Sequence, residues 1–199
     1  SLGERAHVVT ANLGDPAEVE ALQKKAAEAM GSVDILVNNA GITRDNLFMR
    51  MSDEEWAQVL DVNLTSSFRL ARGVLRGMMK ARWGRIVNIS SVVGRAGNAG
   101  QANYAASKGG LVALSKSLAE EVASRGITVN CVAPGAIATD FSGGVVRDNP
   151  QVAQAVANMT ALGRPGLPED IGPMIASLLS DDHRWVNAQR IEVSGGMRI

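Results

Sequence analysis

A tyrosine and a lysine four residues apart, Tyr104 and Lys108, form the first pair in this sequence that could do chemistry. On a helix, side chains at this spacing lie on one face, so both would point the same way. An ammonium group beside a phenol favours the phenolate and lowers the tyrosine pKa from about 10 towards neutrality. Such a tyrosine could donate or accept a proton at working pH. Without other signals, the pair would more often be two unrelated side chains of an amphipathic helix.

A serine hydroxyl is expected beside this pair. Ser91 directly follows the apolar run Arg85–Ser90, which predicts a strand that ends at the mouth of a sheet. Three glycines between Ser91 and Tyr104 allow the chain to turn back towards the tyrosine. There the hydroxyl could hold a carbonyl oxygen beside the phenol. The three side chains together favour proton transfer to or from a carbonyl compound.

The elements that must position these residues alternate between strands and helices. Short apolar runs predict strands at residues 6–12, 34–38, 85–90, 127–133 and 190–194. Apolar stripes and capping residues predict helices at 16–30, 52–81, 103–124, 151–159 and 168–179. Compact apolar strands separated by helices are typical of βαβ units around a buried parallel sheet.

Further motifs add a family resemblance to this pattern. Residues 38–41 read NNAG, Asn63 stands in the sequence DVNL, and Pro134–Gly135 follows a predicted strand. Together with Ser91, Tyr104 and Lys108, these motifs resemble the classical short-chain dehydrogenase/reductase family over the whole chain. From about residue 8 to residue 140 the amino-acid sequence is most similar to those of the 3-oxoacyl-(acyl-carrier-protein) reductases. From residue 141 onward it is more similar to other classical members.

The resemblance implies roles for four catalytic residues. Tyr104 would protonate the forming alkoxide, Lys108 would lower the pKa of Tyr104 and hold the cofactor ribose, and Ser91 would position the carbonyl oxygen. Asn63 would help to hold a water that links Lys108 to bulk solvent. Considered by itself, an asparagine in the middle of a helix is more often a solvent-facing misfit.

The resemblance also implies a nicotinamide cofactor, NADP(H), with NAD(H) left open. The implied cofactor contacts are Asn12, Leu13, Asn39, Ala40, Gly41, Tyr104, Lys108, Pro134, Gly135, Ile137 and Thr139. Considered alone, the NNAG segment could equally be a tight turn after a strand.

The implied fold is α/β, a doubly wound parallel sheet of the Rossmann type with three layers (αβα), in a single domain over residues 1–199. The family's sheet starts with a strand, a glycine-rich phosphate-binding loop, a helix and a second strand. The sequence lacks these roughly 45 residues, so we expect an N-terminally incomplete domain without the first βαβ unit. The sheet edge near residues 34–38 would then be open.

The expected function is NAD(P)H-dependent reduction of 3-oxoacyl-(acyl-carrier-protein) to the 3-hydroxyacyl form in fatty-acid synthesis. A general ketone reductase or secondary alcohol dehydrogenase is the alternative within the family. A catalytically silent, oligomerising remnant is the alternative of another class. Arg82 and Arg125 match positions that contact the acidic carrier protein in the acyl-carrier-protein reductases. Cations are also common at helix C-termini, where they interact favourably with the helix dipole. The family further implies a homodimer or homotetramer formed through the helices at 52–81 and 103–124.

The composition excludes several other classes. The chain is 46% hydrophobic and 20% charged with a net charge of zero, which predicts neither nucleic-acid nor membrane binding. No apolar run reaches the ~18 residues of a membrane span, and the first residues do not predict a signal peptide, so we expect a cytoplasmic protein. Cys131 is the only cysteine and is expected in the core. The two histidines have no partners at ligand spacing, so no metal site is expected.

Overall fold

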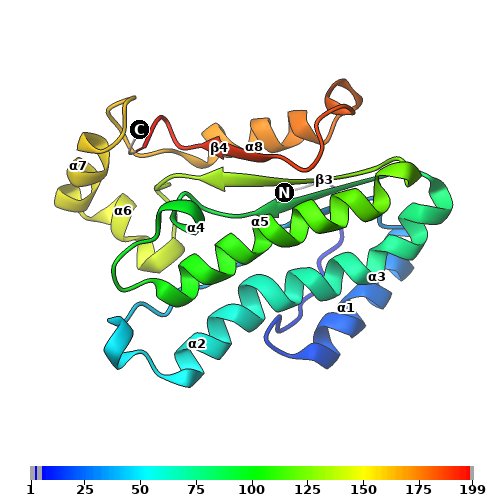
Figure 1. Ribbon diagram of the computed structural model, residues 1–199, viewed down its shortest axis with the longest axis horizontal. Coiled ribbons are helices and arrows are strands. Elements are labelled where there is room, and N and C mark those ends of the chain that lie inside the picture. Colours follow the sequence, from blue (N-terminus) through cyan, green and yellow to red (C-terminus); the bar gives the residue numbers. More distant parts are fainter. Residues whose placement is uncertain (1–2, 4–5, 198–199) are drawn as a thin grey trace.

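The computed structural model describes Gly3 and residues 6–197, in which strands and helices alternate along the chain (Figure 1). The strands are β1 (Ile35–Asn38), β2 (Gly84–Ile89), β3 (Ile127–Pro134) and β4 (Arg190–Val193). The helices are α1 (Pro16–Met30), α2 (Asp53–Leu60), α3 (Ser66–Ala81), α4 (Val93–Ala96), α5 (Ala102–Val122), α6 (Val145–Asp148), α7 (Pro150–Asn158) and α8 (Pro168–Leu178). Shorter or irregular turns are η1 (Phe48–Arg50), η2 (Asp61–Thr65), η3 (Ala123–Arg125), η4 (Phe141–Gly144) and η5 (Asp181–His183).

The strands form one parallel sheet in the order β1-β2-β3-β4 over the described residues. All six residues of β2 are buried, as expected for a parallel strand that is covered on both faces. Successive side chains of a strand point to opposite faces. Ile86 therefore packs with α3 and α5, whereas Val87 and Ile89 pack with Leu178 of α8.

Helices cover both faces of this sheet. Figure 1 shows α1, α3 and α5 on one side and α8 on the other. The first side holds a core of Ala71, Met78, Ala119 and Val122 with residues of β2 and β3, and the second side holds the core around Leu178. The predicted α/β fold, a doubly wound parallel sheet in three layers, is confirmed.

Local signals in the sequence account for where the helices begin. The Asp15 side chain accepts hydrogen bonds from the backbone N–H groups of Ala17 and Glu18 at the start of α1. Ser52 and Glu55 form the predicted capping box of α2. The predicted helices at 16–30, 151–159 and 168–179 are confirmed to within a residue or two. None of the helices in the described part of the chain combines the length and the apolar character that crossing a bilayer requires.

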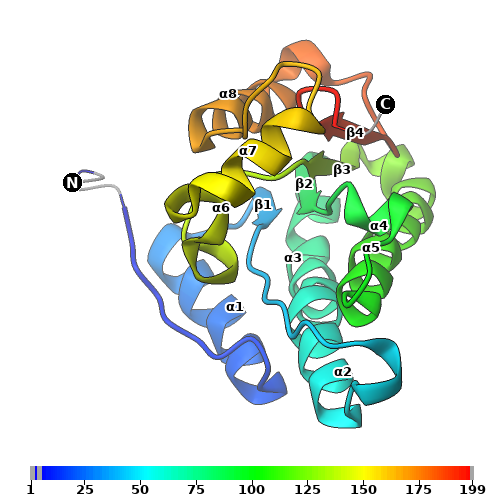
Figure 2. The ribbon, with the colours of Figure 1, turned by 90° about the vertical axis from the view of Figure 1, so that its left-hand side faces the viewer.

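The prediction of a strand at residues 6–12 is wrong. A strand exists only where a neighbour accepts and donates its ladder of hydrogen bonds, and no strand lies alongside this segment among the described residues. In Figure 2 the segment runs outside α1, apart from the four strands.

The long helix predicted at 52–81 is interrupted once. Residues Asp61–Thr65 form η2, a π-helical turn between α2 and α3. An amphipathic period does not reveal such a turn, because the apolar stripe continues on both sides of it. Single π turns are often found at functional sites, and this one contains Asn63.

Candidate active site

A cleft of about 900 Å³ opens at the carboxyl ends of the parallel strands. Asn39 after β1, Ser91 after β2 and Gly135 after β3 all line it. This edge is where ligands bind in open parallel sheets, because the loops that leave the strands diverge there.

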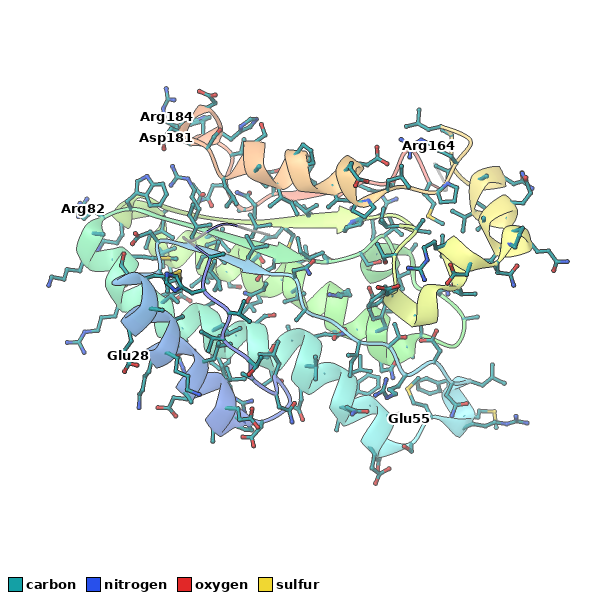
Figure 3. All side chains as sticks on the ribbon, turned by 180° about the vertical axis from the view of Figure 1, so that it is seen from behind. Glu28, Glu55, Arg82, Arg164, Asp181 and Arg184 are labelled. Atoms are coloured by element: carbon teal, nitrogen blue, oxygen red, sulfur yellow. The ribbon has the colours of Figure 1, made fainter. Side chains whose placement is uncertain are left out.

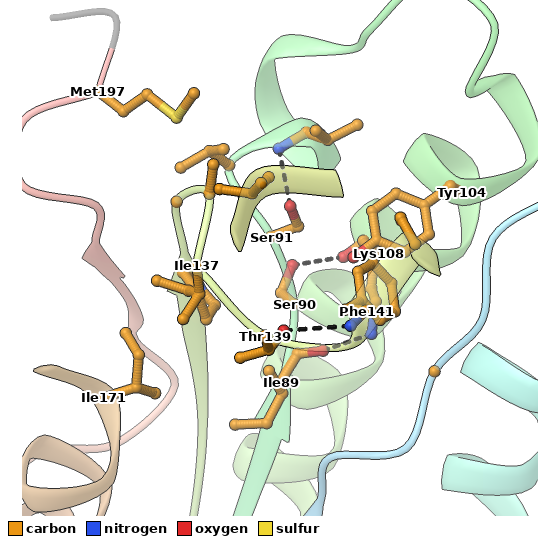
Figure 4. A pocket seen from close by; sticks show the side chains of 18 of the residues that line it. Ile89, Ser90, Ser91, Tyr104, Lys108, Ile137, Thr139, Phe141, Ile171 and Met197 are labelled. Carbon is orange, nitrogen blue, oxygen red and sulfur yellow. Dashed lines mark hydrogen bonds between the residues drawn. The ribbon is translucent and has the colours of Figure 1, made fainter. Parts of the chain in front are cut away.

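The predicted catalytic residues Ser91, Tyr104 and Lys108 meet in this cleft. All three side chains are buried or nearly so. Figure 4 shows Ser91 between Tyr104 and Lys108 on one side and Ile137 on the other. The strand–loop–helix sequence from β2 through α4 to α5 therefore brings the serine and the tyrosine to one place.

Hydrogen bonds hold Lys108 against the end of β2. Its Nζ donates to the carbonyl oxygen of Ile89 at 2.7 Å, and the Ser90 hydroxyl donates to the Lys108 carbonyl oxygen at 2.7 Å. The Nζ lies 5.7 Å from the centroid of the Tyr104 ring. Burial lowers the pKa of Lys108 from 10.5 to about 8, so this ammonium group can release its proton near neutral pH.

The pKa of Tyr104 shifts in the direction opposite to the predicted one. Burial raises its pKa above the usual 10, a hydrogen bond with the Ser91 side chain partly opposes this, and the charge of Asp45 adds to it. The prediction that Lys108 lowers the pKa of Tyr104 is wrong for this structure, because desolvation of the phenolate outweighs every other influence. Tyr104 is therefore a neutral phenol at neutral pH, which suits a proton donor.

Asn63 is buried and does not face solvent, so the solvent-facing alternative is wrong. Its Nδ2 donates to the carbonyl oxygen of Ile42 at 3.0 Å and to Ser107 Oγ at 3.2 Å. Its Oδ1 accepts the backbone N–H of Ile42 at 2.8 Å. The side chain thus ties the segment after β1 to the face of α5 that carries Lys108.

Asn103, which immediately precedes the tyrosine, was not predicted from the sequence. Asn103 is fully buried, and its Oδ1 accepts the backbone N–H of Tyr104 at 2.7 Å. Its Nδ2 donates to the carbonyl oxygens of Arg44 at 2.9 Å and Glu55 at 3.3 Å. Ser107, four residues further on, is equally buried and contacts Asn63. The repetition of small polar residues on one face of α5 was the sequence signal that could have indicated these buried contacts.

Comparison with known proteins agrees with this geometry. The sequence matches the family described as "Enoyl-(Acyl carrier protein) reductase" over residues 1–198. The chain belongs to the short-chain dehydrogenase/reductase family.

Individual relatives in this family are similar over almost the whole chain. A 3-oxoacyl-(acyl-carrier-protein) reductase of Escherichia coli is 52% identical over 98% of this chain and 79% of its own length. The reductase of the same name from Vibrio cholerae is 50% identical with the same coverage. Nodulation protein G of a Rhizobium species is 48% identical over 98% of this chain and 79% of its own length.

Most of the predicted cofactor contacts line the cleft, as a nicotinamide cofactor of this dehydrogenase/reductase family would require. They are Asn39, Ala40, Gly41, Tyr104, Lys108, Pro134, Gly135, Ile137 and Thr139. Asn12 and Leu13 are not among its lining residues, and the Asn12 backbone N–H instead donates to Glu18 Oε2. The structure therefore brings together the residues predicted for the nicotinamide end but not those predicted for the adenine.

Two glycines of the cleft are packed closely against other parts of the chain. A Cβ added to Gly41 would lie 3.3 Å from Lys108 Nζ and 3.4 Å from Asn63 Oδ1, which is tighter than most contacts of a real Cβ. A Cβ added to Gly135 would lie 3.0 Å from the Cα of Ser194. A side chain at either position would press on neighbouring atoms of the protein, so glycine lets residues 41 and 135 keep their places at the cleft.

The two arginines predicted to contact a carrier protein lie together, but at the other end of the sheet. Arg82 follows α3, and its Nη2 donates to the carbonyl oxygen of Ser124 at 3.2 Å, next to Arg125. From Tyr104 to Arg125 the helix rises roughly 30 Å. Figure 3 shows Arg82 near Asp181 and Arg184, whereas Arg164 lies at the opposite end.

No three His, Cys, Asp or Glu side chains gather for a metal ion within residues 6–197.

The buried ammonium of Lys108 predicts a characteristic pH dependence of stability. Between about pH 8 and 10.5 the unfolded chain keeps the Lys108 proton while the folded chain releases it. The folded chain therefore gains stability from this group as pH rises through that window. Relative to the Lys108→Met variant, the free energy of unfolding of the wild type should increase between about pH 8 and pH 10, as measured by urea denaturation.

Lys116→Met is the matched control, since Lys116 lies on the exposed side of the same helix. Its difference from the wild type should stay flat over the same pH range. A flat difference for Lys108→Met as well would contradict a desolvated ammonium.

Proposed function

We propose that this chain reduces the carbonyl group of 3-oxoacyl thioesters to 3-hydroxyacyl thioesters with NADPH, as a 3-oxoacyl-(acyl-carrier-protein) reductase of fatty-acid synthesis. The observation that carries the proposal is the meeting of the Ser91 hydroxyl, the neutral Tyr104 phenol and the Lys108 ammonium in one cleft. Relatives about 50% identical bear the name of this reductase. NADPH rather than NADH, and localisation in the cytoplasm, stay predictions from the sequence.

Ser91 is arranged to hold the carbonyl oxygen. Its Oγ accepts the backbone N–H of Val93 at 3.2 Å, and its hydroxyl, which interacts with Tyr104, would donate its proton to a carbonyl oxygen bound between the two side chains. A fixed donor aimed at the oxygen stabilises the negative charge that grows there during reduction.

Tyr104 is the proton donor for that oxygen. Its raised pKa keeps the phenol protonated, so the proton is present when the alkoxide forms. A bound nicotinamide cofactor would supply the hydride to the carbonyl carbon. Lys108 and the backbone of residues 39–41 and 137–139 would hold that cofactor.

Lys108 and Asn63 would return a proton to Tyr104 after each turnover. The ammonium of Lys108 has a pKa of about 8 and lies beside the tyrosine ring. Gly41 adjoins both residues, since a Cβ built on it would lie 3.3 Å from Lys108 Nζ and 3.4 Å from Asn63 Oδ1. Water held there would connect Lys108 to solvent, as the family resemblance implies.

Arg82 and Arg125 would contact an acidic carrier protein. Within one chain they lie roughly 30 Å along α5 from Tyr104, so the arm of a bound carrier must span that length or reach the cleft of another copy. A second copy packed in the opposite direction against α3 and α5 would bring its cleft nearer. Trp56, Phe68 and Met79 are partly exposed on α2 and α3, which supports pairing of copies through these helices.

The direct test is oxidation of NADPH and of NADH with three substrates: an acetoacetyl thioester, a crotonyl thioester and a simple ketone. We expect NADPH-dependent turnover of the acetoacetyl thioester. Turnover of the crotonyl thioester would indicate reduction of a carbon–carbon double bond, the reaction named in the family's description. Turnover of the ketone alone would indicate a general ketone reductase, and no turnover in a folded sample would favour a silent remnant.

Replacement of Tyr104 by Phe removes the proton donor but keeps the ring. Turnover of the acetoacetyl thioester should fall by about a hundredfold or more, because general acid catalysis contributes at least that much. The Kd for NADPH should stay close to that of the wild type, since the aromatic packing is retained. Turnover at the wild-type rate would show that another group delivers the proton.

Charge reversal at Arg82 and Arg125 separates carrier binding from catalysis. The double variant Arg82→Glu, Arg125→Glu should raise the KM for a carrier-bound substrate by about tenfold or more, because exposed arginines steer an acidic partner. The KM for the same acyl group on a small free thiol should not change. Lys116→Glu, in the middle of α5, is the control and should change neither value. Equal effects on both substrates would contradict a carrier contact.

A further inference from the structure

The short helix α4 holds its side chains in a fixed place beside Ser91. A Cβ on Gly94 would lie 2.8 Å from the carbonyl carbon of Lys108 and 2.9 Å from the nitrogen of Gly109. A Cβ on Gly109 would lie 3.0 Å from the Gly94 oxygen. Because the two backbones touch at this pair of glycines, α4 rests directly on the catalytic helix α5. The next residue, Arg95, is therefore displayed from a fixed turn.

Arg95 is an exposed cation that lines the cleft. Only three residues separate it in the chain from Ser91, which lines the same cleft and beside which the substrate's carbonyl group would bind. Much of the surrounding lining is apolar and includes Val93, Ile137 and Met197. Beside apolar walls a guanidinium attracts an anion more strongly than it does in open solvent.

Glu192, a carboxylate that lines the cleft and feels the charge of Arg95, is already engaged. Glu192 of β4 accepts a hydrogen bond at Oε2 from Arg190 at 3.0 Å and at Oε1 from the Ser194 hydroxyl at 2.9 Å. Partial burial raises the pKa of Glu192, but Arg190, Ser194 and the charge of Arg95 together hold it below its ordinary value. The Arg95 side chain forms no hydrogen bond or ion pair of its own with any described residue, and acts on Glu192 only through the field of its charge.

The charges around this part of the cleft therefore do not cancel. The negative charge of Glu192 is paired with Arg190 at 3.0 Å, so Arg95 has no ion-pair partner among the described residues. Asp45, the other acid of the lining, lies on the Tyr104 side, where its charge acts on that phenol. Asp45 also accepts a hydrogen bond from Gln101 at 3.0 Å. Arg95 therefore keeps a positive charge with free N–H donors in the cleft that Ser91 and Tyr104 also line.

We propose that Arg95 binds an anionic group of the substrate, a carboxylate or a phosphate carried by the oxo compound. This inference deepens the proposed function, because it rests on the reduction of an oxo compound in this cleft and concerns which oxo compounds are preferred. A guanidinium donates two parallel hydrogen bonds to either anion. The expected consequence is a lower KM for anionic oxo substrates than for neutral ones of the same shape.

Two matched pairs of substrates test the proposal and separate the two sources of charge. Acetoacetate and its methyl ester differ in a carboxylate close to the carbonyl group. Acetoacetyl coenzyme A and the acetoacetyl thioester of N-acetylcysteamine differ in phosphates farther along the chain. In at least one pair, Arg95→Gln should raise the KM for the anionic member by about tenfold. The neutral member's KM and kcat should change by less than about twofold.

Two further variants sharpen the test. Arg95→Lys keeps the charge and should keep the preference for the anionic substrate. Arg184→Gln removes an exposed arginine from the opposite end of the molecule and should leave all four KM values unchanged (Figure 3). If Arg95→Gln changes neither pair, or changes anionic and neutral members equally, the proposal is overturned.

A binding measurement distinguishes failure of this inference from failure of the proposed function. Acetoacetate should raise the Tm of the wild type, and it should have no effect on the Tm of Arg95→Gln. This shift does not depend on turnover. Absence of turnover with every thioester would refute the proposed function alone, whereas equal Tm shifts in the two proteins would refute the role of Arg95.

Discussion

The burial of one ammonium group, that of Lys108, constrains most of what surrounds it. A charged amine taken out of water needs hydrogen-bond acceptors placed around it, or it loses its proton. Here the carbonyl oxygen of Ile89, at the end of β2, accepts a hydrogen bond from Lys108 Nζ. The Ser90 hydroxyl donates a second hydrogen bond to the backbone carbonyl oxygen of Lys108. Gly41 leaves room for the Nζ on the third side. The end of β2 and the start of α5 are therefore joined at Lys108, and the segment after β1 packs close to its Nζ.

The remaining parts of the site are consistent with this constraint. Asn63 ties the segment after β1 to α5, and the π turn η2 places its side chain there. Asn103 fixes the first turn of α5 to the loop that precedes α2. Both asparagines satisfy buried backbone groups that would otherwise lack partners, which is the condition for keeping polar residues inside a protein. The result is a rigid support that holds Tyr104 and Ser91 at the mouth of the sheet.

Much of this arrangement could be predicted from the sequence because its signals are local. Capping residues such as Asp15 and Ser52 mark helix starts, and compact apolar runs mark the strands. The spacing of Tyr104 and Lys108, with Ser91 after a strand, was enough to place the three residues in one cleft. These predictions rest on contacts between neighbours in the chain, which the order of residues reveals directly.

The features that were missed depend on contacts between distant segments. The π turn contains Asn63, whose side chain bonds to the backbone of Ile42, and the helical period does not report that contact. The raised pKa of Tyr104 follows from burial by several elements, whereas the sequence suggested only the neighbouring lysine. Residues 6–12 had the composition of a strand but no strand to pair with. Arg95 keeps a free charge because Glu192 is engaged by Arg190, and both of these residues lie nearly a hundred residues further along the chain.

Carbonyl reduction at Tyr104 is tested most sharply by following the hydride itself. The chain would be supplied with an acetoacetyl thioester and NADPH that carries deuterium at the transferred position. We predict a 3-hydroxybutyryl product with one deuterium on the former carbonyl carbon, formed at least about a hundredfold more slowly by the Tyr104→Phe variant. An acetoacetyl thioester recovered unchanged, while a crotonyl thioester gains the label, would contradict carbonyl reduction in this cleft.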